Sequence, residues 1–333
     1  MTNMNLIANP SILSVGRYVP EKVILNEDLK QFPAHTLKLI AQKTGVKSRR
    51  YAAETEYTSD LAVKAATACL DKAGVSVRDV DGIILATSSP DRIQPATATR
   101  VQDKLGAPQA FAFDINAVCT GGIYALSCAE AFIRSGKYKK ILVIASEIYS
   151  RILNPSDFST LPYFGDGAGA VLLGSGREGD ISGILTSILH ADGKGSEAIQ
   201  IPAGGTMKPG WAVKVREEFY FRMQGRVVYD FAVQRGSEAI GECLQGSGFS
   251  IQDVHCILAH QANENVLKEI ASRVGCSYDI FFVNLYHYGN TAGASVFIAL
   301  DEALDQGRIK KGDLIILVAF GGGLTWGSIL IRL

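Results

Sequence analysis

Three side chains that could act on a thioester stand at similar junctions of the sequence. Cys119 lies in DINAVCTGGIYALS (114–127), where an apolar run gives way to two glycines and an alanine-rich helical stretch. His260 lies in LAHQANENVLKEI, where a strand pattern gives way to a helical one, and Asn290 lies in YGNTAGAS. A thiol at a helix N-terminus faces unpaired N–H groups and the positive end of the helix dipole. We therefore expect a nucleophilic Cys119 whose pKa is lowered by roughly one unit from about 8.5.

Each of these residues also has an ordinary structural interpretation. A cysteine among alanines commonly packs in a core, a single histidine is commonly structural, and an asparagine after glycine is commonly a turn residue. Their shared position favours a joint reactive site, because α/β proteins collect catalytic groups at strand ends. The glycines of AFGGGLTWGS (319–328) could bring N–H groups to a developing oxyanion. FGDGAGA (164–170), in contrast, fits no nucleotide-binding motif.

The sequence patterns of the elements that must position these residues occur twice in the chain. AGVSVRDVDGIILA (73–86) resembles SGFSIQDVHCILAH (247–260), and SGKYKKILVIAS resembles QGRIKKGDLIILVAF. Between these matched pairs, CTGG from Cys119 falls opposite NTAG from Asn290. Such repetition indicates two similar halves. We predict halves at 1–175 and 176–333, with Cys119 and Asn290 as near pseudo-symmetry mates where the halves meet.

Composition and patterning indicate a cytoplasmic α/β protein. Val- and Ile-rich runs alternate with longer alanine-rich segments, and 333 residues with 47% hydrophobic content suffice for a large core. The 33 basic and 33 acidic residues cancel, so no net charge favours nucleic acid or an anionic membrane. No signal peptide, membrane-length run or CxxC pair is present, and the six cysteines are scattered. We expect reduced thiols and no zinc site.

A set of motifs together carries a resemblance to a known family: DINAVCTGG, YFGDGAGAVLL, HADGKGSEAIQIPAGG, HQAN, YGNTAGAS and AFGGGLTWGS. In order and spacing they resemble β-ketoacyl-acyl-carrier-protein synthase III, within the thiolase-fold condensing enzymes, from about residue 10 to the C-terminus. The resemblance implies a five-layered αβαβα fold with an internal pseudo-two-fold duplication, and a homodimer. It also implies a triad of Cys119, His260 and Asn290, with an oxyanion hole formed by the N–H groups of Cys119 and Gly322.

The activity implied by the resemblance has two half-reactions. Cys119 takes an acyl group from a thioester donor, usually acyl-CoA. A malonyl thioester on acyl carrier protein then decarboxylates, and its enolate attacks the acylated cysteine to give a β-ketoacyl product. His260 and Asn290 donate hydrogen bonds to the enolate oxygen. The reaction needs neither a metal nor a redox cofactor.

The donor-binding positions depart from the family pattern. The resemblance assigns donor binding to Lys43, Thr44 and Asn263. Leu39, however, stands where relatives that use acetyl-CoA have a tryptophan, and Phe158 stands where they have an arginine. Lys43 also replaces an arginine, and a lysine does not stack as a planar guanidinium does. The aromatic–guanidinium clamp on adenine is missing, which leaves open whether CoA or a carrier protein brings the acyl group.

Two further departures concern the acyl chain and the carrier. Gln94 falls where many relatives place a phenylalanine that reaches across the dimer and limits acyl length, so we expect Gln94 to gate a longer, branched or functionalised acyl group. Asn265 replaces a basic residue that helps to dock carrier protein, although Lys268 and Arg273 remain nearby. The pattern suits a specialised enzyme of secondary metabolism at least as well as a housekeeping enzyme.

Other activities stay open beside decarboxylative condensation. A specialised ketosynthase would join the acyl group to a β-ketoacyl thioester, or an acyltransferase would pass it to a hydroxyl or an amine. A hydrolase would use the same three residue types to release free acid. An inactive partner subunit would shape another ketosynthase's cavity, although such subunits usually lose the nucleophile that Cys119 supplies here.

Overall fold

The computed structural model describes residues 9–176 and 182–333, and two mixed sheets organise them. The first sheet has the order β1-β7-β6-β4-β5 and the second the order β11-β12-β13-β8. The strands of the first sheet are β1 (Ser11–Tyr18), β4 (Gly82–Ala86), β5 (Phe111–Ile115), β6 (Lys140–Glu147) and β7 (Gly167–Gly174). Those of the second are β8 (Gly183–Ala191), β11 (Cys256–Ala259), β12 (Leu314–Gly321) and β13 (Thr325–Arg332). Every residue of β4, β7, β11 and β12 is buried, because helices cover both faces of each sheet.

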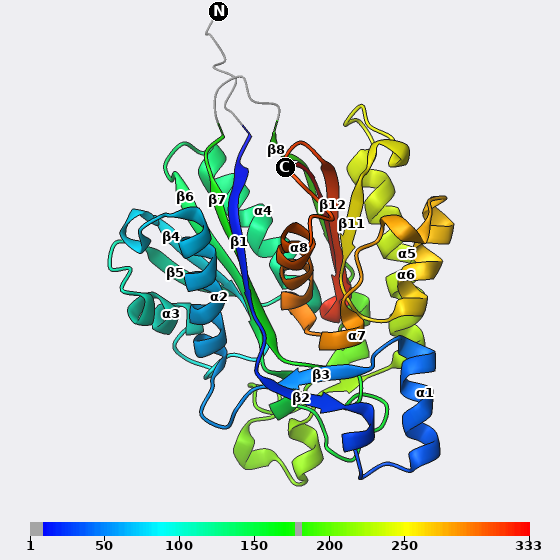
Figure 1. Ribbon diagram of the computed structural model, residues 1–333. Coiled ribbons are helices and arrows are strands. Elements are labelled where there is room, and N and C mark those ends of the chain that lie inside the picture. Colours follow the sequence, from blue (N-terminus) through cyan, green and yellow to red (C-terminus); the bar gives the residue numbers. More distant parts are fainter. Residues whose placement is uncertain (1–8, 177–181) are drawn as a thin grey trace, which may run out of the picture.

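Helices form three further layers, two outside the sheets and one between them (Figure 1). The outer helices are α2 (Thr58–Ala73) and α3 (Thr97–Leu105) on the first sheet, and α5 (Gly225–Leu244) and α6 (Glu264–Val274) on the second. The central helices are α4 (Gly121–Arg134) and α8 (Ser295–Asp305), and each contacts strands of both sheets. The layers therefore follow the order α, β, α, β, α, which confirms the predicted architecture.

The two halves repeat one topology. In the first sheet β4 is parallel to β6, while β6 and β7, and β7 and β1, are antiparallel. In the second sheet β11 is parallel to β12, while β12 and β13, and β13 and β8, are antiparallel. The first sheet adds β5 beside β4. In the described part of the second half, a single parallel bridge between Ile257 and Phe281 occupies the corresponding position.

The sequence repeat has a structural basis in the connection from helix to strand. Gly74 and Gly248 follow α2 and α5 with left-handed φ values of 62° and 80°, which glycine adopts without strain. Ser76 and Ser250 then begin a short 3-10 turn before β4 and β11. All strands of the first sheet come from residues 11–174 and those of the second from residues 183–332. The predicted boundary at 175/176 adjoins residues 177–181, which lie outside the described residues.

Smaller elements gather at one end of the two sheets (Figure 1). They are β2 (Lys22–Leu25), β3 (Ser48–Tyr51), α1 (Ala34–Thr44), α7 (Leu285–Tyr288), β9 (Ile199–Gln200) and β10 (Arg222–Met223). β2 pairs with β3, and β9 pairs with β10. α1 belongs to the first half of the chain, yet it contacts α6 of the second half. Within the two described ranges, no helix combines the length and the apolar character that crossing a membrane requires.

Candidate active site

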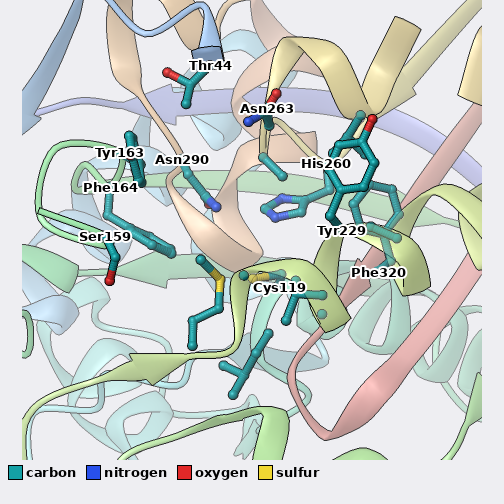
Figure 2. A pocket seen from close by; sticks show the side chains of 18 of the residues that line it. Thr44, Cys119, Ser159, Tyr163, Phe164, Tyr229, His260, Asn263, Asn290 and Phe320 are labelled. Carbon is teal, nitrogen blue, oxygen red and sulfur yellow. The ribbon is translucent and has the colours of Figure 1, made fainter. Parts of the chain in front are cut away.

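A cavity of about 550 Å³ is lined by residues of both halves. The side chains of Cys119, His260 and Asn290 line this cavity and point toward one another (Figure 2). Cys119 lies in the 3-10 turn η3 (Val118–Thr120) between β5 and α4, His260 follows β11, and Asn290 follows α7. Their exposed fractions are 7%, 2% and 7%. The structure thus brings together the three residues that the sequence singled out.

The turn that carries Cys119 is held in an unusual backbone conformation. Val118 has a φ of 48°, a region that a β-branched residue rarely adopts and that costs about 1–3 kcal/mol. The Asn116 side chain accepts a hydrogen bond from the Val118 N–H at 3.3 Å. From the other half of the chain, the Thr325 carbonyl accepts a hydrogen bond from the Thr120 hydroxyl at 3.0 Å. Contacts from both halves therefore fix the position of the sulfur.

The pseudo-symmetry mate of Asn290 is Asn116, and the predicted match of Asn290 with Cys119 is wrong. The Oδ1 of Asn290 accepts from the N–H of Ala292, two residues ahead, as Asn116 does from Val118. Ala292 has a φ of 45° and begins the 3-10 turn η10 (Ala292–Ala294) before α8, as Val118 begins η3 before α4. Cys119 therefore corresponds to Gly293. A Cβ at Gly293 would lie 2.9 Å from the Val118 carbonyl oxygen, so this close approach requires glycine.

The thiol of Cys119 is buried in an apolar environment. Burial raises the pKa of Cys119, and the negative charge of Glu147 raises it further. The predicted lowering of this pKa by the helix N-terminus is therefore wrong, because desolvation of the thiolate outweighs the nearby N–H groups. Cys119 belongs to the same hydrophobic cluster as Phe164 and Phe320, two aromatic residues that also line the cavity.

The imidazole of His260 is neutral at physiological pH. Burial lowers the pKa of His260 to about 3. Its Nδ1 lies 2.7 Å from the Ser295 hydroxyl, and the ring lies edge-on to Phe320 at a centroid distance of 5.6 Å. The Ser295 oxygen also accepts a 3.4 Å hydrogen bond from the N–H of Gln261. Sequence reasoning missed Ser295, although it ends the YGNTAGAS motif five residues after Asn290.

The amide of Asn290 is held in a defined orientation. Its backbone N–H donates to the Tyr163 carbonyl at 2.8 Å, and its carbonyl accepts from the Gly165 N–H at 3.0 Å. Because Oδ1 accepts from Ala292 at 2.8 Å, the Nδ2 end of the amide is the end left for the cavity. The assignment of the two amide ends follows from this hydrogen bond. The site therefore offers an N–H donor beside the imidazole.

The glycine turn after β12 lies directly against Cys119. A Cβ at Gly321 would lie 2.7 Å from the Cβ of Cys119 and 2.9 Å from its backbone nitrogen, and Gly321 lines the cavity. Gly322, the predicted oxyanion residue, packs against Val118 and Ile199 instead. Sequence reasoning did not separate these two glycines, because a glycine triplet does not show which member touches the thiol. The role of the Gly322 N–H stays a prediction.

The predicted donor-binding residues lie at the mouth of the same cavity. Lys43, Thr44 and Asn263 all line it, and Thr44 and Asn263 lie beyond Asn290 and His260 from Cys119 in Figure 2. Two of them also have a structural role: the Thr44 hydroxyl donates to the Ile40 carbonyl at 2.7 Å, and Asn263 caps α6. Their position is compatible with donor binding, which stays a prediction.

The other three specificity positions lie away from the cavity of a single chain. Gln94 is exposed in the loop before α3 and does not line the cavity, so its predicted gating role requires a second chain and stays a prediction. Leu39 is 36% exposed on α1. Phe158 lies edge-on to Phe32 at 5.2 Å. Phe158 therefore packs against the chain's own aromatic residue.

The chain has a duplicated five-layer fold, and a thiol, an imidazole and a carboxamide surround one cavity between its halves. This combination defines the thiolase-fold condensing enzymes. Comparisons with known proteins identify the family within this class. The family profile described as 3-oxoacyl-(acyl-carrier-protein) synthase III matches residues 113–193, and its C-terminal counterpart matches residues 244–333. A β-ketoacyl-acyl-carrier-protein synthase III from Natranaerobius thermophilus is 43% identical over 328 residues, which cover 98% of this chain and 100% of the relative.

Solved structures agree with these matches. A β-ketoacyl-acyl-carrier-protein synthase III from Thermus thermophilus superimposes with a TM-score of 0.90 and 38% identity, covering 97% of this chain and 99% of the other. The priming β-ketosynthase of a polyketide pathway gives a TM-score of 0.90 and 28% identity, covering 98% and 97%. The chain belongs to the 3-oxoacyl-acyl-carrier-protein synthase III family. It is a condensing enzyme of fatty acid synthesis, an acyltransferase that forms carbon–carbon bonds.

Proposed function

We propose that Cys119 is the acyl-accepting nucleophile of this condensing enzyme and that His260 and Asn290 stabilise the enolate that attacks it. The observation that carries the proposal is the convergence of these three side chains, from both halves of the chain, on one cavity of about 550 Å³. The groups differ in chemistry as the two half-reactions require. A thiol can carry an acyl group, whereas a neutral imidazole and an amide can donate hydrogen bonds to an oxyanion.

In the first half-reaction, the sulfur of Cys119 attacks the carbonyl carbon of an acyl thioester. The new C–S bond forms, the donor's C–S bond breaks, and the thiol proton leaves with the donor's sulfur. The N–H groups of Cys119 and Gly322 stabilise the oxyanion, and the loss of one such donor typically costs about 10²–10³ in rate. The donor enters past Lys43, Thr44 and Asn263, which line the mouth.

In the second half-reaction, a malonyl thioester on acyl carrier protein loses carbon dioxide in the same cavity. The enolate carbon attacks the acyl carbonyl, the C–S bond to Cys119 breaks, and the released thiolate takes up a proton. The Ser295 oxygen accepts from Gln261 and lies 2.7 Å from Nδ1 of His260, and we assign the Ser295 hydroxyl as the hydrogen-bond donor to Nδ1. The neutral ring then carries its proton on Nε2, and this N–H and the Asn290 amide hold the enolate oxygen. The reaction uses neither a metal nor a redox cofactor.

The enzyme functions as a homodimer in this proposal. β5 ends the first sheet, and all five of its residues are only partly buried, so its outer edge is available to a second chain. Ile93 and Gln94 lie in the loop before α3, and Ile93 is 81% exposed. Pairing of two β5 edges would bring the Gln94 loop toward the partner's cavity. The six cysteines are free thiols, which supports a reducing compartment, the cytoplasm.

The decisive experiment detects the acyl group on Cys119. Intact-mass spectrometry after incubation with a panel of acyl-CoA and acyl-carrier thioesters should show one acyl group per chain. The Cys119→Ala variant should remain unmodified. The control variant Cys128→Ala, which lacks a thiol on α4, should be acylated as the wild type is. Addition of malonyl-carrier protein should then release carbon dioxide and a β-ketoacyl product. Acylation without malonyl-dependent carbon dioxide release, followed by free acid, would instead identify a hydrolase.

A further inference from the structure

Arg49 is a fully buried guanidinium that the proposed mechanism does not use. It lies on β3, in the first half of the chain, and is 0% exposed. Burial lowers the pKa of Arg49 to about 10, so the side chain keeps its charge at neutral pH. Burial of a charge is costly unless hydrogen bonds compensate for the lost water, and Nε has no hydrogen-bond partner among the described residues. The other donors of the guanidinium must therefore offset most of this cost.

These donors connect β3 to a distant segment of the chain. Nη1 donates to the Ile24 carbonyl at 3.3 Å, and Nη2 donates to Oδ1 of Asn26 at 2.6 Å and to the Pro162 carbonyl. The first two acceptors are local, because β2 pairs with β3 and Asn26 follows β2. The third lies 113 residues farther along the chain. A planar guanidinium can hold several acceptors at once, so it ties β3 to the 162–165 segment.

The 162–165 segment in turn holds the backbone of Asn290. The Tyr163 carbonyl accepts from the Asn290 N–H at 2.8 Å, and the Gly165 N–H donates to the Asn290 carbonyl at 3.0 Å. These two bonds form a parallel bridge between Phe164 and Asn290. In Figure 2, Tyr163 and Phe164 lie beside Asn290 on the side away from His260. The position of Asn290 therefore depends on a segment from the other half of the chain.

The packing around Arg49 leaves little freedom at this junction. A Cβ at Gly165 would lie 3.1 Å from the Cβ of Arg49 and 2.2 Å from the Tyr288 carbonyl oxygen. A Cβ at Gly289, the residue before Asn290, would lie 3.3 Å from the Cβ of Arg49. β3 also contacts α7, the helix that ends directly before Gly289 (Figure 1). Arg49 thus lies where β3, the 162–165 segment and the residues leading to Asn290 meet.

We propose that Arg49 is a positioning residue for Asn290: its guanidinium fixes the 162–165 segment and, through it, the amide that donates to the enolate oxygen. The inference rests on the proposed role of Asn290 in the second half-reaction. The turn that carries Cys119 is held by Asn116 and Thr325 instead. Loss of the guanidinium should therefore slow condensation and spare acylation, because a displacement of about 1 Å can cost about 10²-fold in rate.

The test measures the two half-reactions separately. Intact mass over time gives the acylation rate of Cys119 with a thioester that acylates the wild type. The acylated enzyme is then freed of donor and mixed with malonyl-carrier protein, and loss of the acyl group with formation of β-ketoacyl product gives the condensation rate. In Arg49→Met, which keeps an apolar stem and removes the guanidinium, condensation should slow at least about tenfold. Acylation should stay at the wild-type rate.

Arg50→Met is the matched control on the same strand. The Arg50 side chain donates to the Pro20 and Glu21 carbonyls at 3.3 and 3.1 Å, and consecutive strand residues point to opposite faces. Both half-reactions of this variant should proceed as in the wild type. A folded Arg49→Met enzyme that condenses at the wild-type rate overturns the proposal. Equal slowing of both half-reactions also overturns it, because it indicates a general loss of structure.

A double-mutant cycle tests whether Arg49 acts through the amide. Asn290→Ala removes the amide, so adding Arg49→Met to this variant should slow condensation little further. A merely structural role for Arg49 would slow condensation by the same factor with and without the amide. Such additive behaviour overturns the proposal.

Arg49→Lys decides the question where Arg49→Met does not fold. Its nitrogen takes the place of the guanidinium carbon, so the charge is kept while the fork that reaches the three oxygens is lost. Condensation should slow by a smaller factor than acylation would predict from its wild-type rate, and unchanged condensation overturns the proposal.

The two proposals fail in distinguishable ways. An enzyme that is acylated at Cys119 and condenses normally without the guanidinium contradicts only the role of Arg49. A wild-type enzyme that no thioester acylates contradicts the proposed function, and the role of Arg49 falls with it.

Discussion

At the residue scale, His260 and Glu147 are two buried groups whose pKa values move in opposite directions. Burial lowers the pKa of His260 from 6.5 to about 3 and raises that of Glu147 from 4.5 to about 7, because it disfavours each charged form. Between about pH 3 and 6.5 the unfolded chain binds a proton at residue 260 that the folded chain does not, so stability falls as pH falls. Between about pH 4.5 and 7 folded Glu147 keeps a proton that the unfolded chain loses, so stability falls as pH rises.

The contribution of His260 can be measured by substitution. His260→Asn removes the titration of residue 260. The difference in the free energy of unfolding, variant minus wild type, should therefore be about 2 kcal/mol larger at pH 5 than at pH 7.5. Urea unfolding at the two pH values measures this difference. His35→Asn, at an exposed position on α1, serves as the control and should follow the wild type. Equal acid sensitivity in His260→Asn and wild type would show that the imidazole is not buried in its neutral form.

At the element scale, the repeated junctions explain what could be predicted about the site. The glycines Gly74 and Gly248, both with left-handed φ, and the turn serines after them recur at fixed spacing, so the repeat could be predicted from the sequence. The alignment of the two copies around Asn290 could not be predicted from the sequence. The small residues align CTGG with NTAG in the sequence. The φ values and side-chain hydrogen bonds instead align Asn116 with Asn290 in the structure.

The close approach of the β12 turn to η3 gives a prediction at this scale. Gly321→Ala places a methyl group 2.7 Å from Cys119 Cβ and 2.9 Å from its backbone nitrogen, so η3 must move. Gly321 has a φ of −172°, which any residue adopts, and the effect is therefore steric. Acylation of Cys119, followed by intact mass over time, should slow at least about tenfold, because displacement of reacting groups by about 1 Å is costly.

Gly241→Ala provides the control for this substitution. Gly241 is exposed on α5, and a Cβ there would have no atom within 4 Å. The variant should be acylated at the wild-type rate and should gain about 0.5–1 kcal/mol of stability, because alanine favours the helix. If Gly321→Ala is acylated as fast as Gly241→Ala, the two turns do not hold each other in position.

At the scale of the whole molecule, the family resemblance that the motifs carry was sufficient to predict the layers, whereas the electrostatics of the site were not predictable. The pKa of Cys119 depends on burial by residues from both halves, which no local pattern records. Glu147 was likewise overlooked, because in KKILVIASE it reads as an ordinary polar strand end. Its burial arises from the loop after β4 and from the η10 turn, both of which are distant from it in sequence.

The proposed dimer gives a prediction at the same scale. Ile93→Asp places a charge on an 81% exposed apolar residue beside Gln94, and burial of that charge in the interface should shift the dimer toward monomer. Sedimentation velocity at micromolar concentration measures the shift. Met207→Asp, at a 94% exposed residue distant in sequence, should remain dimeric. A monomeric wild-type protein, or equal behaviour of the two variants, would contradict association through this edge.

The single bridge at Phe281 has a consequence for assembly. The first sheet ends in a complete strand, β5, whereas the matching border of the second sheet carries only that one bridge. A chain with a full fifth strand on both sheets would offer two such edge strands for pairing, so further chains could add at both edges without limit. Of these two matching borders, only that of the first sheet carries a full strand in the described residues, so the proposed association through β5 would close at two subunits.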